Sequence, residues 1–160
     1  MIEVQPIGHV RAARAEAKDD YWGGAQSRIE LAPEFDASAL DGLDAFSHVE
    51  VLFHFHLADP ARIETRARHP RNNPQWPKIG IFAQRGKNRP NRIGSCIVKL
   101  VSREPRALVV LELDAIDGTP VLDLKPVMAE FLPREPVSQP DWSRELMRDY
   151  WAVGERIVAK

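Results

Sequence analysis

The sequence contains a single cysteine, Cys96, so no internal disulfide can form. Cys96 lies in an apolar run, which favours an inert core thiol over a nucleophile. No uninterrupted apolar stretch approaches the roughly 18 residues that cross a bilayer, and the N-terminus lacks a basic region followed by an apolar one. These absences argue against a disulfide scaffold and against membrane-spanning helices, and they favour a cytoplasmic protein.

Motifs of the common nucleotide-binding folds are missing as well. No Gly-x-Gly-x-x-Gly follows a strand-like segment, there is no Walker loop, and Gly23-Gly24 alone is a weak signal. Serine, histidine and aspartate are present, but no nucleophile elbow brings them together as a catalytic triad. A phosphate-binding Rossmann or P-loop domain is therefore not indicated.

The net charge is small, but the charged residues are strongly segregated. The net charge is −1, yet residues 62–106 carry twelve Lys and Arg against two acids, and the rest of the chain carries ten against 21. A basic segment in an otherwise acidic chain is typical of a surface that meets a polyanion, with RNA the obvious candidate. The alternative is that folding interleaves the two signs into ordinary surface ion pairs.

Strand-like segments recur at short spacing, without long helices between them. They include residues 7–10, 28–31, 49–57, 79–83, 93–101, 107–115 and 121–124, separated by turn-rich breaks. A chain of 160 residues with this pattern predicts one mainly β domain, a compact antiparallel barrel or closed sheet with short helical turns such as one within 36–43.

The C-terminal segment has a different pattern. Pro140 is placed to start a helix, and Trp142, Leu146, Tyr150 and Val153 follow at near-helical spacing. We therefore divide the chain into a barrel domain, residues 1–132, and a C-terminal helical extension, residues 133–160. The aromatic stripe of that extension is expected to pack on the barrel or on a second subunit.

Residues 78–94 are the most informative stretch. Apolar segments flank a polar loop that is rich in guanidinium and amide groups, and Pro90 restricts the backbone of Arg89. Two strands would hold this loop rigidly, and its fixed array of donors suits an anionic or nucleotide-like ligand. A solvated hairpin tip is the alternative.

Histidines gather on the strand-like run from His48 to Leu57. Because side chains alternate along a strand, Val49, Val51, Phe53, Phe55 and Leu57 should face the core, and His48, Glu50, Leu52, His54 and His56 the other side. A His-x-His pair could chelate zinc, with Glu50, Asp59 or His69 as further ligands. A polar site lining in which one histidine meets a ligand is the preferred interpretation.

A second polar element is the bend Asp117-Gly118-Thr119-Pro120. Asp-Gly is a turn signal, and Pro120 stiffens the exit. The bend is either a simple turn between strands or a site that offers backbone amides and a carboxylate to ribose hydroxyls or an amino group.

Four pieces of the sequence, in order, resemble the TsaA-like family, which includes YaeB, TrmO and VirR. The resemblance runs from about Pro6 to Pro126. Its pieces are residues 6–10, residues 40–48, the loop residues 81–85 with 88–94, and the bend with its strand, residues 117–126. Each piece is modest, and their combination is specific.

The resemblance implies a compact β-barrel methyltransferase that uses S-adenosylmethionine. It implies a homodimer with the cofactor near the subunit interface, and N6-methylation of threonylcarbamoyladenosine at position 37 of tRNA. No metal is expected, because the sequence offers no clear third and fourth ligand beside the His-x-His pair. The implied cofactor contacts are Gly24, Ala25, Gln26, His56, Leu57, Arg85, Asp117, Gly118, Thr119 and Pro120, and the implied substrate contacts are Arg85, Arg89 and Asn91. By residue type, His56 and Asp117 are candidates for the base that accepts the N6 proton.

The chain departs from the family pattern at three places. It has Gly24-Ala25-Gln26 where Pro-Arg-Gln is usual, His56-Leu57 where His-Gln or His-Lys is usual, and altered residues beside Arg85 and Asn91. Backbone contacts tolerate such changes better than side-chain contacts. Two alternatives therefore stay open: an S-adenosylmethionine-binding module without catalysis, and a metal-dependent hydrolase that uses His54 and His56.

Overall fold

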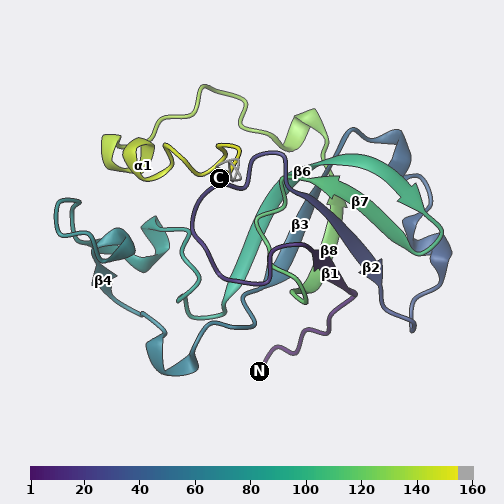
Figure 1. Ribbon diagram of the computed structural model, residues 1–160, viewed down its shortest axis with the longest axis horizontal. Helices are drawn as coiled ribbons and strands as arrows, with labels where there is room; N and C mark the ends of the chain where they lie inside the picture. The colour runs from purple at the N-terminus through teal and green to yellow at the C-terminus, as the bar shows by residue number, and fades with distance from the viewer. Residues whose placement is uncertain (155–160) are drawn as a thin grey trace, which may run out of the picture.

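The strands of this chain close into one barrel because apolar and polar residues alternate along them. The computed structural model describes residues 1–154. Its antiparallel strands form a closed barrel in the order β1-β2-β7-β6-β3-β8 (Figure 1). They span Gly8–Ala12 (β1), Gln26–Leu31 (β2), His48–His54 (β3), Ile93–Glu104 (β6), Ala107–Leu111 (β7) and Pro120–Pro126 (β8). The predicted antiparallel β-barrel is confirmed.

Inward-facing side chains from all six strands fill the barrel. In β3, Val49, Val51 and Phe53 are at most 2% exposed, and the residues between them are partly exposed. The buried cluster also contains Val10, Ile29, Cys96, Val98, Leu108, Val110 and Val121. Removing this apolar surface from water is the main contribution to the stability of the fold.

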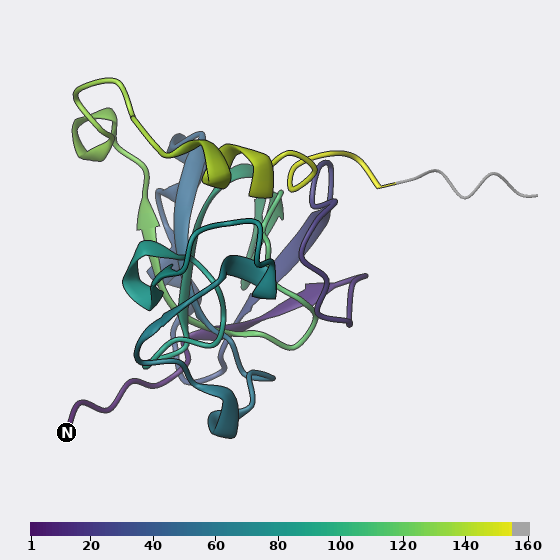
Figure 2. The same cartoon turned by 90° about the vertical axis from the view of Figure 1, so that its left-hand side faces the viewer.

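Helical segments are short and lie outside the barrel. The 3₁₀ helices are Ala37–Leu40 (η1), Leu43–Ala45 (η2), Pro60–Arg62 (η3), Pro70–Asn72 (η4), Ile81–Ala83 (η5) and Ala129–Phe131 (η6). The α-helix α1 spans Asp141–Leu146 and begins directly after Pro140, as predicted. In the long connection between β3 and β6, β4 (Ala67–Arg68) pairs with β5 (Ile79–Gly80) to form a separate small sheet. Figure 2 shows this connection and α1 with the left-hand side of Figure 1 turned toward the viewer.

Two predictions about strands are wrong. The apolar run 79–83 gives only the two residues of β5, because the chain turns into η5 from Ile81 onward and pairs with β4 instead of joining the barrel. The polar loop after it is therefore no hairpin tip between two barrel strands. Leu57 was expected in the core but is 64% exposed, because β3 ends at His54 and the alternation of faces ends with it.

The C-terminal helix is shorter than the spacing predicted. α1 ends at Leu146, so Tyr150 and Val153 lie beyond it on a backbone that turns and then runs beside residues 21–23. Residues 155–160 of the predicted extension lie outside the described part of the chain. Within residues 1–154, no helix combines the length and the apolar character needed to cross a membrane.

Candidate functional site

The strand register brings three connections to the same end of the barrel. Ala12 at the end of β1 pairs with Ser27 near the start of β2, and Leu111 at the end of β7 pairs with Gln26. His54 at the end of β3 pairs with Ile93 at the start of β6. The connections 13–25, 55–92 and 112–119 therefore leave from one end, which we call the loop end, and every predicted cofactor residue lies there.

Backbone strain is concentrated at the loop end. Among residues 1–154, the non-glycine residues with positive φ are Tyr21, Arg71, Asn72, Arg92 and Glu112, and each lies in one of these three connections. Non-glycine residues in this region of φ cost free energy, and they persist where the surrounding structure holds them for a purpose. Such a concentration favours a functional role for this end over a merely solvated set of loops.

The bend Asp117–Pro120 is held tightly against β1. Its backbone N–H groups are all used inside the protein: Asp117 donates to Arg14 O, Gly118 to Val10 O and Thr119 to Ile116 O. The Asp117 carboxylate accepts the N–H of Ala12 at 3.0 Å. The expectation that this bend offers backbone amides to a ligand is therefore wrong, since neighbouring carbonyls already occupy those donors.

What the bend can still offer is acceptors. One carboxylate oxygen of Asp117 and the carbonyls of Asp117 and Gly118 have no described hydrogen-bond donor. Gly118 has φ of +79°, and a Cβ there would lie 3.9 Å from His56 Nε2. The bend and His56, far apart in sequence, thus lie side by side at the loop end, and acceptors in this place suit an amino or hydroxyl group.

The histidines at the end of β3 do not share one face. His54 is the last strand residue, and His56 lies in the turn beyond it, so the predicted His-x-His face is wrong. Burial, followed by the nearby charges of Arg92 and His56, lowers the pKa of His54. Among residues 1–154, no three His, Cys, Asp or Glu side chains come together in a way that could hold a metal ion.

The turn Gly24-Ala25-Gln26 is tied to the end of β7. Gly24 has φ of +71° and donates its N–H to the Glu112 carboxylate at 3.1 Å. Glu112 in turn donates its backbone N–H to Ala25 O at 2.7 Å. A Cβ on Gly24 would meet nothing within 4 Å, so open space adjoins this backbone, and a ligand can approach it closely.

The loop from Gln84 to Arg92 is braced by its own side chains. Arg89 donates to Gln84 O at 2.8 Å, and Arg92 donates to Ala58 O at 3.3 Å. Arg85 is exposed and donates to Ser95 O at 2.7 Å with one of its guanidinium nitrogens. Asn91 is exposed, with no described side-chain hydrogen bond. The loop is thus fixed by contacts with the barrel end rather than by two flanking strands.

A buried polar cluster at the loop end escaped the sequence reasoning. The Tyr150 hydroxyl donates to Asp114 Oδ2, while Asp114 Oδ1 is buried without a described partner. Burial first, and then the charge of Asp114, raise the pKa of Tyr150 and of the Cys96 thiol, and the charge of Arg85 opposes both shifts. The position of Asp114 directly after an apolar segment could have marked it as a candidate site residue. Nothing in the sequence indicates that Tyr150, 36 residues away, is its partner.

The burial and raised pKa of Cys96 agree with the expectation of an inert thiol. Its Sγ points to Glu112 O at 3.5 Å. A thiol that stays protonated is a poor nucleophile. Cys96 therefore belongs to the buried core next to the loop end, and we assign it no direct chemical role.

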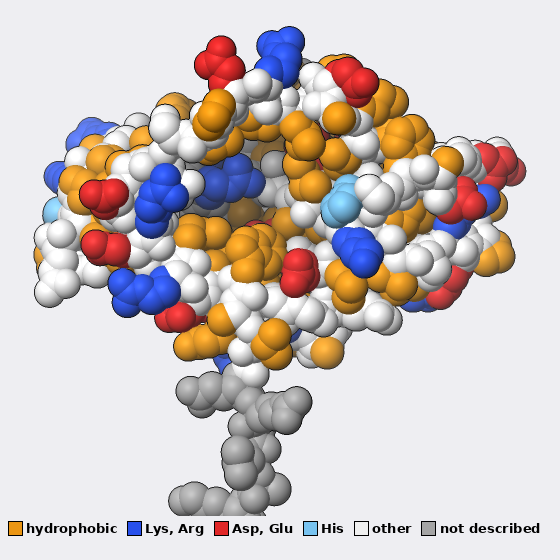
Figure 3. Space-filling model, turned by 90° about the horizontal axis from the view of Figure 1, so that it is seen from above, with side chains coloured by type: hydrophobic (Ala, Val, Ile, Leu, Met, Phe, Trp, Pro, Cys, Tyr) orange, Lys and Arg blue, Asp and Glu red, His pale blue; other side chains and the backbone are white. Residues whose placement is uncertain are grey.

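Much of the basic segment remains available for a polyanion. Of its twelve Lys and Arg, only Arg62, Arg71 and Arg103 form ion pairs within residues 1–154. Pairing of the two signs of charge on the surface, the alternative considered from the sequence, therefore accounts for only three of these twelve residues. Seen from above, the molecule has a hollow on the side of the loop end, with Lys or Arg side chains inside it (Figure 3).

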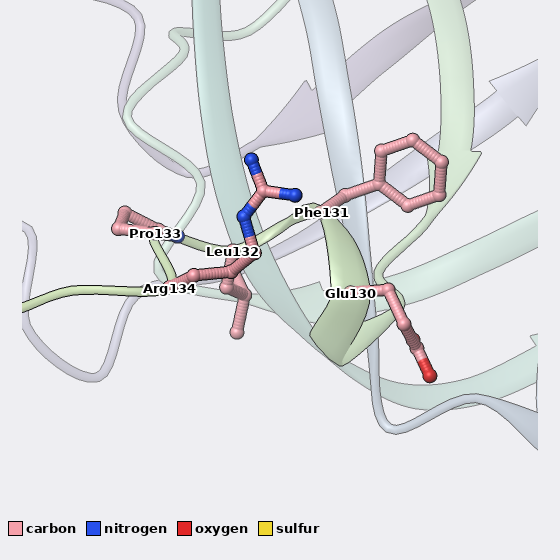
Figure 4. Close-up of a pocket in the computed structure, with 5 residues that line it drawn as sticks. All are labelled: Glu130, Phe131, Leu132, Pro133 and Arg134. Atoms are coloured by element: carbon pink, nitrogen blue, oxygen red, sulfur yellow. The ribbon is translucent and has the colours of Figure 1, made fainter.

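Two shallow pockets lie away from the predicted residues. One is lined by Asp44, Arg103, Glu104 and Pro105 at the opposite end of the barrel. The other is lined by Glu130–Arg134, where Phe131 and Arg134 point in different directions from the chain (Figure 4). Both are open to solvent and neither contains a predicted site residue, so the loop end stays the stronger candidate on its residues and contacts.

Comparison with known proteins identifies relatives for most of the chain. The family described as the tRNA-methyltransferase O N-terminal domain matches residues 17–131. RcsF of Pseudomonas aeruginosa, named as a candidate S-adenosylmethionine-dependent methyltransferase, is 34% identical over 96% of this chain and 71% of its own length. The Escherichia coli (strain K12) protein named tRNA (adenine(37)-N6)-methyltransferase is 40% identical over 64% of this chain and 46% of its own length.

A solved structure agrees with these matches. The crystal structure of TrmO from Pseudomonas aeruginosa superposes with a TM-score of 0.71 at 31% identity, covering 89% of this chain and 62% of that one. The chain therefore spans less than two thirds of that structure and less than half of the Escherichia coli relative.

Proposed function

Because the chain belongs to the family of the tRNA-methyltransferase O N-terminal domain, we propose that it transfers a methyl group from S-adenosylmethionine to tRNA. The acceptor atom is N6 of the adenosine at position 37. In the substrate that we propose, this adenosine is already modified to threonylcarbamoyladenosine. The family match and the names of the relatives support the reaction class. The observation that carries the proposal is the convergence of all predicted cofactor segments at the loop end.

The chemistry of the loop end fits this cofactor. Acceptors on the bend suit the amino and hydroxyl groups of an adenosyl moiety, and the open backbone at Gly24 allows close approach. Arg85 offers a guanidinium that suits a carboxylate. Gln26, His56, Leu57, Thr119 and Pro120 would line the same site. The cofactor, when bound, supplies an activated methyl group on a positively charged sulfur.

The residues of the chain contribute alignment and proton transfer. The braced loop 84–92 and the fixed bend hold their groups in constant positions, which favours an in-line attack and limits access of water. A base must accept the N6 proton. His56 lies beside Gly118, whereas Asp117 already uses one carboxylate oxygen for Ala12, so we assign the base to His56.

The tRNA would bind through the basic segment. Seven of its nine Lys and Arg that form no ion pair within residues 1–154 lie in the connection 55–92, and these would contact phosphates without reading the base sequence. Arg89 and Asn91 would hold the substrate, although Arg89 also braces the loop. Arg85 is placed to hold the carboxylate of the modified base or that of the cofactor. A tRNA substrate also supports a cytoplasmic location.

A homodimer is the assembly that we propose. The outer face of β6 exposes Ile93, Ile97 and Val101 by 40%, 49% and 48%, and η6 exposes Phe131 by 85%. On this face the apolar side chains alternate with Ser95 and Lys99, and exposed apolar side chains gathered on a sheet face are typical of an interface. We also keep the division into a barrel, residues 1–132, and an extension, residues 133–160, whose part up to residue 154 contacts the barrel domain through residues 21–23.

The test is methyl transfer from labelled S-adenosylmethionine to tRNA. Purified tRNA that carries threonylcarbamoyladenosine at position 37 should accept label, and the same tRNA without that modification serves as the matched control. Label in neither tRNA, nor in any other tRNA supplied, would refute the proposal. Binding of the cofactor by calorimetry without any transfer would instead support a non-catalytic binding module.

A further inference from the structure

The C-terminal segment after α1 is built into the loop end and does not merely cover it. Tyr21, Trp22 and Gly23 donate their backbone N–H groups to Asp149 O, Tyr150 O and Ala152 O, at 3.0, 2.8 and 3.2 Å. A Cβ on Gly23 would lie 2.1 Å from Trp151 O, so the two backbones touch. The family match ends at residue 131, before this segment begins.

This contact places Tyr150 among the predicted cofactor segments. Its carbonyl holds Trp22, two residues before Gly24, and its hydroxyl holds Asp114, three residues before Asp117. Arg85 lies within electrostatic reach of both Tyr150 and Cys96. The pair of Asp114 and Tyr150 therefore joins the connections 112–119 and 13–25, and Arg85 of the connection 55–92 lies within range of the charge on Tyr150.

The Asp114 carboxylate is only half satisfied. Oδ2 accepts from Tyr150, but Oδ1 is buried and receives no hydrogen bond from the described residues. The Cys96 thiol lies within hydrogen-bonding range of the Asp114 carboxylate, but a thiol is only a weak donor. A buried carboxylate oxygen without a donor is costly, and in native proteins such an atom is satisfied by a bound water, an ion or a ligand, or serves a catalytic role. The negative charge suits a cationic ligand.

We propose that Asp114 is a cofactor-binding residue whose Oδ1 accepts an N–H of S-adenosylmethionine, and that Tyr150 is the positioning residue that holds this carboxylate. The C-terminal segment thereby forms one wall of the cofactor site. This inference rests on the proposed function. It adds two residues to the site, one of them from a part of the chain that the family match does not include.

The experiment compares three variants of the full chain with the wild type, using calorimetry with S-adenosylmethionine. Asp114→Asn removes the charge and keeps the shape, and Tyr150→Phe removes only the hydroxyl. Tyr21→Phe is the matched control, because its side chain is exposed and no hydrogen bond of its hydroxyl is described. We expect the first two variants to bind the cofactor about tenfold more weakly or worse, and the control to bind like the wild type.

Methylthioadenosine, which lacks the amino-acid part, identifies the donor. Methylthioadenosine also lacks the sulfonium charge, whereas S-adenosylhomocysteine lacks that charge but keeps the α-ammonium group. If Asp114→Asn weakens S-adenosylmethionine and S-adenosylhomocysteine but not methylthioadenosine, the donor is the α-ammonium group; if it weakens all three equally, the donor is on the adenine. In the transfer assay, Tyr150→Phe should raise the KM for the cofactor, while kcat at saturation stays near the wild-type value.

Two results would overturn the inference. Wild-type affinity in both Asp114→Asn and Tyr150→Phe would do so, even if their thermal unfolding temperatures fell, because that pattern reports a structural role only. A wild-type protein that binds no S-adenosylmethionine would refute the proposed function and this inference together. The two failures are therefore distinguishable.

Discussion

Gly94 offers a strict test of the packing at the loop end. It lies in β6 opposite Phe53 of β3, and a Cβ there would come within 2.5 Å of two ring carbons of Phe53 and 2.9 Å of Phe55. Phe53 is 2% exposed and packs edge-on against Phe55, with ring centroids 5.3 Å apart. The Phe53 ring is enclosed by the core, so Gly94→Ala must either displace it or force the strands apart.

The magnitude follows from two opposing effects. Overpacking a dense core costs about 1–3 kcal/mol. Replacing glycine restricts the unfolded chain and returns roughly 0.4–1 kcal/mol. We expect the free energy of unfolding to fall by about 1–2 kcal/mol, which lowers the Tm by roughly 2–8 °C in a chain of this size. Because Phe55 precedes His56, cofactor affinity should fall as well.

Urea unfolding followed by circular dichroism measures this change. Gly86→Ala is the matched control, since a Cβ at Gly86 meets nothing within 4 Å, and its stability should stay within about 0.5 kcal/mol of the wild type or rise. An unchanged urea midpoint in Gly94→Ala, with an unchanged slope, would show that β3 and β6 leave room for a Cβ at Gly94 and would contradict this prediction.

Three further predictions follow from other contacts. Gly23→Ala places a Cβ 2.1 Å from the backbone of the C-terminal segment, so it should release that segment, detected as faster proteolysis there than in the wild type. Arg71→Met breaks a pair with Asp20 that is held by two hydrogen bonds of 2.8 and 3.0 Å, and it should lower the free energy of unfolding in urea by about 1–3 kcal/mol. Arg62→Met, which breaks an exposed pair, should lower it by less than about 0.5 kcal/mol. Equal losses in the two variants would contradict this prediction. Burial lowers the pKa of His54, so the unfolded chain takes up a proton before the folded chain does as the pH falls. The wild type should therefore lose more stability from about pH 7 to about pH 5 than His54→Gln, and parallel pH profiles would refute the assignment.

The barrel strands could be predicted from the sequence because strand alternation is a local signal. In β3, Val49, Val51 and Phe53 alternate with less buried residues, and in β6 Cys96, Val98 and Leu100 do the same, although Ile93, Ile97 and Val101 are apolar and exposed. Apolar residues alone gave a wrong prediction where the segment pairs outside the barrel. The run 79–83 is apolar, but the chain before it supplies β4 as a closer partner, and alternation alone does not say which strand pairs with which.

The candidate site could be predicted only in part. The bend 117–120 and the loop 84–92 were identified by turn residues and by resemblance, which are properties of adjacent positions. The donors that the bend was expected to offer turned out to be occupied by Val10, Arg14 and Ile116. Hydrogen-bond occupancy depends on partners distant in sequence, so no local pattern reveals it.

The sequence by itself determined the strands, the bends and the family to which the chain belongs, because each depends on neighbouring residues or on their order along the chain. Only the tertiary structure decided that three connections meet at one end of a barrel and that Tyr150 reaches Asp114 there. The physical reason is that barrel closure fixes which strand ends lie together, and closure is a property of all six strands at once.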